Sequence, residues 1–381
     1  MVSGEGSVVA LYDTVKEIQE LYGCLQDQIS RDTFWARLAF DVEPSIANAM
    51  KLLQMNPHFN QEQIKRLQTW RNTIERVQKD GKKYVLYGTG GHGQELAGAL
   101  QMSGVEFYGF CGRRGPNAFP DGLMGKPVIT PDTLLQNTDD FYISVCAGGE
   151  SASEIAELLK EHNFPEDHIL DIFDLCTPGN MYFEFQRLYH PGTAFVDAGC
   201  YNCNDDYRFA EWSKGQYSSI IAFEPDPVQY KQCQEQLARR NIRGMRLIQA
   251  GLSNRSGTVE FAVKNAGGSH IVQQDMSVQI GHGRVNEYVT VPITTLDHVI
   301  SDETVGFIKM DVEGAELDAL RGSVNVITKD KPFLAISVYH KPGDVLALMQ
   351  YIHEIVPEYR FWLRHYGALF YETVLYASTD N

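Results

Sequence analysis

The sequence contains no long apolar run and no excess of positive charge. None of its hydrophobic stretches approaches the roughly 18 residues that a membrane-spanning helix needs, and no basic start leads into an apolar segment. Its 33 Lys and Arg residues are outnumbered by 49 Asp and Glu residues, which gives a net charge of −16. Such an acidic chain lacks the basic surface that binds nucleic acids or anionic membranes. We therefore expect a soluble cytoplasmic protein that binds neither nucleic acid nor membrane.

Cysteine is too scarce and too scattered for a disulfide framework. The seven cysteines are odd in number and spread over 381 residues, which favours a reducing compartment. Cys200 and Cys203 have the C-x-x-C spacing of half a zinc site or of a redox pair. A zinc knuckle needs a second pair at a similar spacing, and the sequence has none. We therefore interpret these two cysteines as small residues in a tight loop.

The patterning of the chain divides it into three units. With 43% hydrophobic and 22% charged residues, the composition is that of an ordinary globular protein large enough for two or three domains. The units that we expect are a helical segment over residues 1–80, a small α/β domain over 81–176 and a larger α/β domain over 177–381. The first has helical periodicity, with boundaries near Asp32 and Pro44. Its apolar faces predict a helical cap or an element that pairs two chains in a homodimer.

The middle unit carries a glycine loop between a strand and a helix. Residues 83–87 are predicted to form the strand, and Gly88, Gly90 and Gly93 fit the pattern G-x-G-x-x-G of Rossmann-like nucleotide-binding domains. The helix that follows would offer N–H groups and a partial positive charge to an anion. We therefore expect a second nucleotide site here. The alternative is a domain that only positions its neighbour.

The residues after the second strand of this unit favour a phosphorylated ligand. An NAD site has an acidic residue at this point, which binds the ribose hydroxyls. This sequence has Cys111 there, followed by Arg113 and Arg114, which fit a phosphorylated ribose or a nucleotide diphosphate better. Through Tyr87-Gly-Thr-Gly-Gly-His-Gly93 and the strand Tyr108-Gly-Phe110, the unit resembles the nucleotide-sugar-binding domain of bacterial sugar acetyltransferases. The resemblance implies a nucleotide-sugar as its ligand.

Strands in the third unit end on polar residues, as in parallel sheets that bind ligands at their carboxyl edge. The predicted strands end near Asp197, Glu224, Gln249, Asp311 and His340. Two further strands, over 359–365 and 372–377, are joined by a short turn, which predicts an antiparallel hairpin. Residues 257–296 alternate polar and apolar side chains and contain several glycines. They predict a β-rich insertion over the carboxyl edge of the sheet.

Two of these strand ends have the chemistry of a nucleoside site. Asp197 is followed by Gly199 in an Asp-x-Gly turn, and Glu224 ends the next strand. A carboxylate can accept hydrogen bonds from both hydroxyls of a ribose. Together with Asp311, two strands later, the pair indicates a nucleoside-binding transferase and not a hydrolase.

The same stretches resemble the FkbM family of S-adenosylmethionine-dependent methyltransferases. The matching segments are Phe195–Tyr201, Ala222–Asp226, Thr294–Asp297, Ile308–Glu316 and Ile336–His340. The resemblance implies a Rossmann-like class I fold with seven mostly parallel strands, and S-adenosylmethionine as the cofactor. It also implies methyl transfer to an oxygen acceptor, often a hydroxyl of a sugar or natural product. Cys203 departs from the family pattern, in which a second glycine is usual, and its β-carbon would crowd or reshape the cofactor loop.

The resemblance also assigns residues to the cofactor. Asp197 would hold its amino-acid end, and Glu224 its ribose. The full set expected to bind the cofactor is Asp197, Gly199, Tyr201, Asn202, Glu224, Asp226, Gly251 and Asp311. Tyr182 and Phe183, just before the first strand, are expected to be packing residues.

Methyl transfer to a hydroxyl benefits from a general base or a metal, because the pKa of a hydroxyl lies far above 7. Asp311 and His340 end neighbouring strands, and His340 is the expected base because an imidazole titrates near neutrality. Asp311 would orient it. Alternatively, Asp311, Glu313 and His340 bind Mg²⁺ or another divalent cation. The residues expected to line the acceptor pocket are Ser269, His270, Arg364, His365 and Tyr366.

Two other functions compete with the methyltransferase. In one, the middle unit is the active domain of a nicotinamide-dependent oxidoreductase, against which Cys111 and the Asp197–Glu224 pair both argue. In the other, the chain is a non-catalytic binding protein that has kept two nucleotide folds. Only Cys203 favours the second alternative, whereas intact Asp311 and His340 oppose it.

Overall fold

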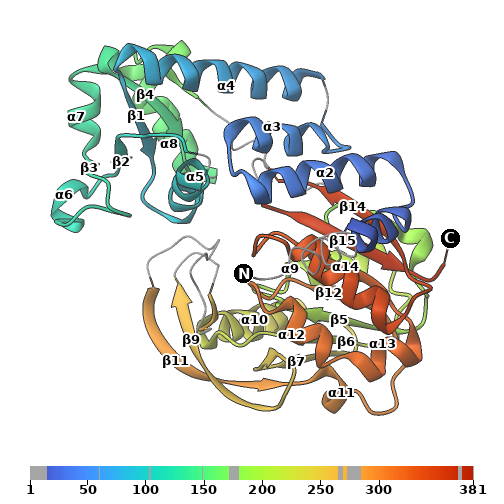
Figure 1. Ribbon diagram of the computed structural model, residues 1–381. Coiled ribbons are helices and arrows are strands. Elements are labelled where there is room, and N and C mark those ends of the chain that lie inside the picture. Colours follow the sequence, from blue (N-terminus) through green and yellow to red (C-terminus); the bar gives the residue numbers. More distant parts are fainter. Residues whose placement is uncertain are drawn as a thin grey trace, which may run out of the picture.

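A computed structural model describes residues 15–59, 61–102, 104–147, 149–170, 180–264, 269–272, 285–367 and 371–380 of the chain. Figure 1 shows a small α/β domain, a larger α/β domain and a set of N-terminal helices that spans both. Among these residues, no helix is both long enough and apolar enough to cross a bilayer.

The N-terminal helices are positioned by polar caps. Residues 15–23 are helical, followed by α2 (Gln28–Val42), α3 (Ile46–Gln54) and α4 (Gln61–Asp80). The carboxylate of Asp27 accepts a hydrogen bond from the Ser30 amide and thereby caps α2. The boundary predicted at Asp32 is therefore wrong, since this residue lies inside α2. The boundary at Pro44 is confirmed, because Ser45 caps α3 directly after it.

The apolar faces of these helices are buried within the chain itself. Phe34 of α2 belongs to the core of the larger domain, whereas Trp70 and Ile74 of α4 pack into the core of the small domain. The Ser30 hydroxyl also accepts a hydrogen bond from the backbone of Leu363. The helices therefore join two domains, and their apolar faces give no support to the dimer expected from the sequence.

The small domain has a four-stranded parallel sheet with strand order β3-β2-β1-β4. Its strands are β1 (Lys83–Tyr87), β2 (Gly109–Cys111), β3 (Val128–Ile129) and β4 (Phe141–Val145). Its helices are α5 (Gly91–Met102), α6 (Gly115–Ala118), α7 (Pro131–Leu135) and α8 (Gly149–Glu161). The predicted boundary between this domain and the next, at residues 176–177, lies outside the described residues.

The larger domain is built on a seven-stranded sheet with strand order β14-β15-β13-β12-β5-β6-β7. Its strands are β5 (Ala194–Ala198), β6 (Ile220–Phe223), β7 (Met245–Ile248), β12 (Val305–Met310), β13 (Phe333–Ser337), β14 (Arg360–His365) and β15 (Thr373–Ser378). Its helices are α9 (Asn204–Trp212), α10 (Pro227–Arg239), α11 (Leu296–Val299), α12 (Glu316–Arg321), α13 (Val324–Asp330) and α14 (Asp344–Ile355). Strand β15 inserts between β13 and β14 and runs antiparallel to both, as the predicted hairpin requires.

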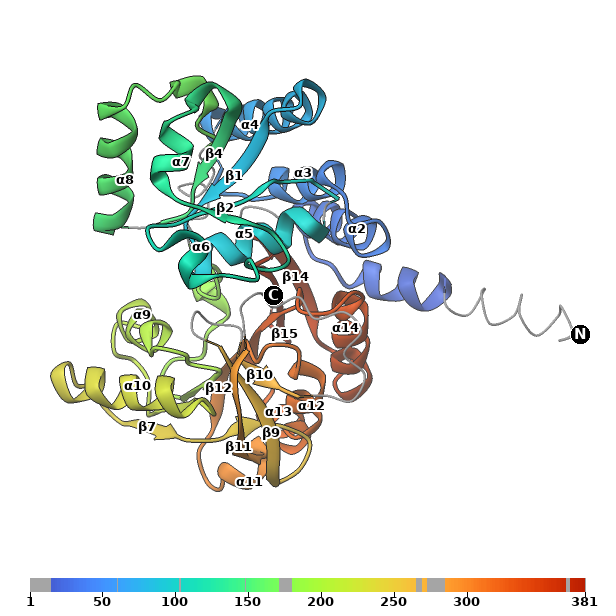
Figure 2. The same cartoon turned by 90° about the vertical axis from the view of Figure 1, so that its left-hand side faces the viewer.

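A second small sheet covers one end of the larger domain (Figure 2). It comprises β8 (Gly251–Leu252), β9 (Gly257–Lys264), β10 (His270–Ile271) and β11 (Val285–Thr294), in the order β10-β9-β11-β8. Phe261 of β9 and Ile271 of β10 line a cavity at the carboxyl edge of the main sheet. The predicted β-rich insertion is therefore present, and it forms one wall of this cavity.

Candidate active site

A cavity of about 990 Å³ lies where the two α/β domains and the small sheet meet. The larger domain supplies most of its wall, from the loops that follow β5, β6 and β12. The small domain contributes Gly91 and His92, at the start of α5. Parallel strands present their carboxyl ends to ligands in this way, so the predicted edge of the sheet is the candidate site.

The loop after β5 is shaped by backbone conformations that are unusual for non-glycine residues. Gly199 has a φ of +83°, and a β-carbon there would lie 1.9 Å from the carbonyl oxygen of Asp311. Tyr201 and Cys203 also have positive φ values, of 49° and 59°. Cys203 thus adopts a conformation that favours glycine. Its side chain is buried and is not among the cavity-lining residues, so the expected crowding of the cofactor is not observed.

Glu224, at the end of β6, faces the cavity with an ordered carboxylate. Its two oxygens accept backbone hydrogen bonds from Tyr201 at 2.9 Å and from Asp226 at 2.8 Å. Burial raises the pKa of Glu224 to about 8, although these two hydrogen bonds oppose the shift. A carboxylate held in place by two N–H groups still has free lone pairs for the hydroxyls of a ligand.

The other predicted cofactor residues differ in what they do. Tyr201, Asn202, Asp226 and Gly251 all line the cavity. Asp226 also caps α10, because its carboxylate accepts hydrogen bonds from the amides of Val228 and Gln229. Asp197 does not line the cavity, since its side chain is fully buried behind the wall.

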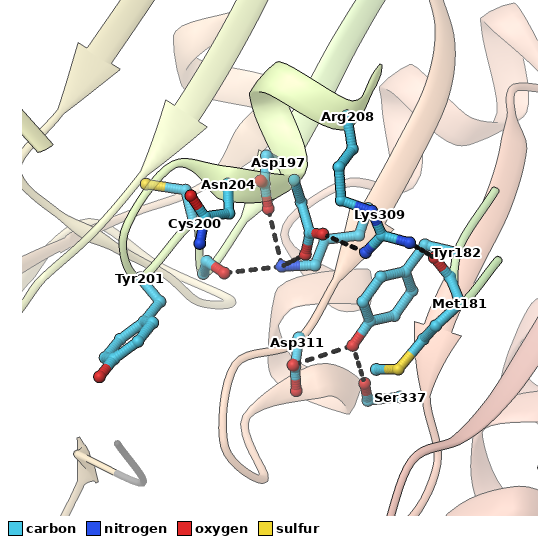
Figure 3. A network of polar contacts seen from close by, with 12 residues as sticks. Met181, Tyr182, Asp197, Cys200, Tyr201, Asn204, Arg208, Lys309, Asp311 and Ser337 are labelled. Carbon is cyan, nitrogen blue, oxygen red and sulfur yellow. Dashed lines mark hydrogen bonds and ion pairs between the residues drawn. The ribbon is translucent and has the colours of Figure 1, made fainter. Parts of the chain in front are cut away.

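Asp197 instead forms a buried ion pair with Lys309 of β12 (Figure 3). Lys309 Nζ lies 2.9 Å from Asp197 Oδ1 and donates a hydrogen bond of 2.7 Å to the carbonyl oxygen of Gly199. Burial lowers the pKa of Lys309, but the carboxylates around it, above all Asp197, outweigh burial and raise it. Lys309 lines the cavity and therefore presents a fixed positive charge there. Asp197 acts on the site through this lysine.

Asp311 follows β12 and also faces the cavity. Its Oδ2 accepts a hydrogen bond of 2.9 Å from the hydroxyl of Tyr182, which in turn lies 3.0 Å from the Ser337 hydroxyl. Burial tends to raise the pKa of Asp311, but His340, Lys309 and the hydrogen bonds to its carboxylate lower it overall. The residue is therefore an anion near neutral pH. Tyr182 was predicted to be a packing residue, but it also lines the cavity.

His340 lies behind Asp311, among carboxylates. Its Nδ1 is 2.9 Å from Glu316, and its Nε2 is 3.4 Å from Asp311 and 3.6 Å from Glu313. Burial lowers the pKa of His340, but Glu316 and the other two carboxylates raise it to about 10. The ring is therefore a cation near neutrality, and it does not line the cavity. This environment argues against the predicted general base, because a protonated imidazole cannot accept a proton.

The same cluster is the part of the site that could hold a metal ion. Ligand atoms of Asp311, Glu316 and His340 lie within 4.8 Å of one another. However, Glu316 Oε1 already accepts hydrogen bonds from the amides of Val312 and Gly314. A cation would also have to displace the proton from His340, so the donor set fits a divalent ion poorly.

The residues predicted to line the acceptor pocket separate into two groups. Ser269 lines the cavity, and its neighbour His270 is buried in β10. Arg364, His365 and Tyr366 lie elsewhere, in buried contacts within the larger domain and with the N-terminal helices. Arg364 pairs with Asp27 and Glu184, His365 lies 2.9 Å from the Thr373 hydroxyl, and Tyr366 donates a hydrogen bond to Glu184.

In the glycine loop of the small domain, close backbone contacts require glycine at two positions but not at a third. A β-carbon at Gly88 would lie 2.3 Å from the Cys146 carbonyl oxygen, and one at Gly93 would lie 2.0 Å from that of Gly88. A β-carbon at Gly90 would have no atom of the described residues within 4 Å, so a side chain there would meet open space. Arg113 pairs with Glu154, and Arg114 is exposed at the start of α6. Neither arginine lines the cavity.

Several cavity residues have no counterpart in the sequence-based set. They are Asn204, Asp205, Arg208, Gln229, Lys309 and Glu372. Lys309 could have been identified from the sequence, because a lysine in an otherwise apolar strand needs a carboxylate partner. Glu372 could not have been identified in this way, since it lies directly before β15 and no motif marks it.

Comparison with known proteins supports the assignment of the larger domain. Residues 197–370 match the family model described as the Methyltransferase FkbM domain. The 2-O-methyltransferase NoeI of Sinorhizobium fredii (strain NBRC 101917 / NGR234) is 29% identical over 154 residues, which are 37% of this chain and 61% of that protein. Methyltransferase 1 of Beauveria bassiana (strain ARSEF 2860) is 28% identical over 207 residues, 49% of this chain and 74% of that protein.

A crystal structure of methyltransferase FkbM from Methylobacillus flagellatus KT aligns with a TM-score of 0.48 and 17% identity, over 92% of this chain and 99% of that one. The family model covers the strand ends that carry Asp197, Glu224, Asp311 and His340. These are the positions at which the sequence resembled the family. Residues 197–370 of this chain are therefore similar to the methyltransferase domains of the FkbM type.

Proposed function

We propose that the chain transfers a methyl group from S-adenosylmethionine to a hydroxyl oxygen of a sugar or natural-product acceptor. The observation that carries the proposal is the carboxylate of Glu224, which two backbone N–H groups hold at the cavity wall. This is the arrangement needed to accept both ribose hydroxyls of an adenosine. The 2-O-methyltransferase among the similar proteins supports an oxygen acceptor.

The charge of the cavity suits a cationic cofactor. Its acidic lining residues are Asp205, Glu224, Asp226, Asp311, Glu313 and Glu372, whereas its basic ones are Arg208 and Lys309. S-adenosylmethionine supplies an electrophilic methyl group on a positively charged sulfur. Lys309 is bonded to Gly199 and Asp197, and its positive charge would attract the carboxylate of the amino-acid end. A polyanionic nicotinamide dinucleotide fits this balance of charge less well.

We assign the proton transfer to Asp311, with His340 as a positioning residue. Asp311 faces the cavity as an anion, so it can accept the proton that the acceptor hydroxyl loses. His340 Nε2 lies 3.4 Å from the carboxylate of Asp311, and its positive charge lowers the pKa of Asp311. The roles expected from the sequence are thereby exchanged. A divalent cation is the alternative, and resistance of turnover to a chelator would eliminate it.

The acceptor would enter between the two α/β domains. Gly91 and His92, at the amino end of α5, face the same cavity as Asp311 and Ser269. A nucleotide carried by the small domain could therefore present an attached sugar to the methyltransferase domain. Anion binding at the amino end of a helix supports this part of the proposal.

Calorimetric titration with S-adenosylhomocysteine tests the cofactor site. We expect micromolar binding to the wild-type protein and at least about tenfold weaker binding to Glu224→Gln, because one group that pairs with the ribose is lost. NADPH and UDP-sugars are titrated in parallel. Binding of NADPH without S-adenosylhomocysteine would establish the oxidoreductase alternative instead.

Radiolabelled methyl transfer to a panel of sugars and nucleotide-sugars tests the reaction. Asp311→Asn should lower the rate at least about 100-fold, because the proton acceptor is lost. Binding of S-adenosylhomocysteine to this variant should stay within a few-fold of the wild type. If Asp311→Asn retained the full rate while Glu224→Gln lost binding, the cofactor assignment would stand and the proton acceptor would be wrong.

A further inference from the structure

Three buried cysteines lie close together at the loop after β5. Cys200 and Cys203 belong to the loop after β5, and Cys233 comes from α10. The side chains are 3%, 0% and 0% exposed, respectively. All three sulfur atoms lie within 4.8 Å of one another, and those of Cys200 and Cys203 are 3.9 Å apart. The fold therefore adds a third thiol to the C-x-x-C pair.

These separations suit a shared metal ion better than a disulfide. In tetrahedral zinc sites the Zn–S distance is about 2.3 Å, which places two sulfur ligands roughly 3.8 Å apart. A disulfide would need a separation of about 2.05 Å. The 3.9 Å between Cys200 and Cys203 is close to the first value and almost twice the second.

A buried carboxylate in the helix that follows Cys203 lacks a hydrogen-bond partner. Asp206, in the first turn of α9, is fully buried, and neither of its carboxylate oxygens has a hydrogen-bond partner. It lies three residues after Cys203 in the chain, and its oxygen atoms are outside the 4.8 Å group formed by the three sulfur atoms. An unpaired carboxylate is costly to bury, and a metal ion would offset this cost. Carboxylate oxygen is also an established zinc ligand.

We propose that Cys200, Cys203 and Cys233 bind one Zn²⁺ ion, and that Asp206, three residues after Cys203, turns its carboxylate towards the ion as the fourth ligand. Binding releases the thiol protons, because thiolates are the ligands. A site with four protein ligands is closed and therefore structural. The proposal is independent of the reaction that the domain catalyses.

Such an ion would fix the shape of the cofactor loop. Cys200 and Cys203 lie in the same loop as Tyr201, whose amide donates to Glu224, so the ion would hold this loop to Cys233 of α10. The ion would also tie the start of α9 to α10, since its ligands come from both. This arrangement accounts for a cysteine at position 203, where the family usually has a glycine.

Metal analysis of the purified full-length protein, with any affinity tag removed, tests the site. We expect about one zinc per chain by mass spectrometry of the metal content. Cys233→Ser should lower the zinc affinity at least about tenfold. Cys111→Ser and Cys146→Ser are matched controls, because both cysteines are buried in the small domain, and they should keep the zinc. Loss of zinc in the controls, or its retention in Cys233→Ser, would overturn the proposal.

Cobalt substitution of the metal-free wild-type protein provides a second measurement that needs no variant. We expect thiolate-to-cobalt charge-transfer bands and the visible bands of a tetrahedral ion. Asp206→Asn should keep the charge-transfer bands and shift the visible ones, because one oxygen ligand changes. Absence of cobalt bands, or a Cys200–Cys203 disulfide in freshly purified protein, would refute the site.

Discussion

The hydroxyl of Tyr182 donates a 2.9 Å hydrogen bond to Asp311, a residue 129 positions later in the chain. Tyr182 precedes the first strand of the large sheet, whereas Asp311 follows β12. The bond fixes one oxygen of the proposed proton acceptor and leaves the carboxylate facing the cavity. Two segments that are far apart in the sequence thus combine to shape one reacting group.

Replacing Tyr182 with phenylalanine should raise the pKa of Asp311, because the hydrogen bond stabilises the carboxylate anion. The acidic limb of the pH–rate profile should then move to higher pH. Turnover should fall about tenfold, as expected for a hydrogen bond to a charged group. Tyr189→Phe is the control, since its hydroxyl bonds to the Gln216 carbonyl away from the site, and its profile should match the wild type. An unshifted limb in Tyr182→Phe would mean that Asp311 is not the group that titrates.

His340→Gln should lose stability in a way that depends on pH. The pKa of His340 is about 10 in the folded protein, above its unfolded value of about 6.5, so its ion pairs stabilise the fold fully below pH 6.5. That contribution disappears as the pH rises through 10. Urea unfolding at pH 6 should show a loss of about 3 kcal/mol relative to the wild type, and the difference should shrink at pH 10. A difference that grew with pH would contradict the protonated state.

Cofactor affinity should depend on the ionisation of Glu224. The pKa of its carboxyl group is about 8 in the ligand-free protein, so the group is mostly protonated at pH 6. Ribose hydroxyls bond best to the anion, and S-adenosylhomocysteine should therefore bind more tightly as the pH rises towards 8 and level off above it. Titrations from pH 6 to 9 measure this. Glu224→Gln should bind S-adenosylhomocysteine weakly, with an affinity that does not change with pH. If the affinity of this variant rose with pH as in the wild type, another group would be the one that titrates.

Gly199→Ala should abolish cofactor binding through a steric clash. A β-carbon would lie 1.9 Å from the Asp311 carbonyl oxygen, so the two strand-end turns would have to separate. Gly192→Ala is a matched control, because Gly192 has a similar φ of +84° but no neighbour within 4 Å. It should cost only about 1 kcal/mol of stability and leave affinity unchanged. Equal effects in both variants would show that backbone strain alone matters.

The ion pairs of Arg364 should hold the N-terminal helices to the methyltransferase domain. Its guanidinium lies 2.6 Å from Asp27 and 2.8 Å from Glu184, and its side chain is 5% exposed. Arg364→Leu should lower the free energy of unfolding by about 3–5 kcal/mol, because it leaves two carboxylates without their partner. Arg113→Ala, at an exposed pair with Glu154, should cost less than about 1 kcal/mol in the same urea titration. Similar losses in the two variants would contradict this account.

Local sequence was enough to find the strand ends and the turns that follow them. Asp-x-Gly at 197–199 and Asp-Val-Glu-Gly at 311–314 are short motifs, whose apolar strands and glycine turns encode their structure locally. The strand β12 and the left-handed Gly199 follow from them directly. The fold class could be predicted for this reason, whereas the proposed cofactor rests on the resemblance of these motifs to the FkbM family.

The roles of the charged residues could not be predicted in the same way. His340 was expected to titrate near neutrality, but Glu316, Glu313 and Asp311 surround it and hold its proton. Arg364 and Tyr366 were expected at the acceptor, yet they bind Asp27 and Glu184 from distant parts of the chain. The pKa and the partner of a buried charge depend on neighbours that the local sequence does not reveal.

The positions where strands end in carboxylates and where glycine is required follow from the sequence alone, because backbone conformation and apolar periodicity are local properties. Which carboxylate faces the cavity, which lysine neutralises Asp197 and which thiol joins Cys200 and Cys203 depend on long-range contacts in the fold. Burial removes water from these groups, so their chemistry is set by the few side chains that the fold brings within a few ångströms.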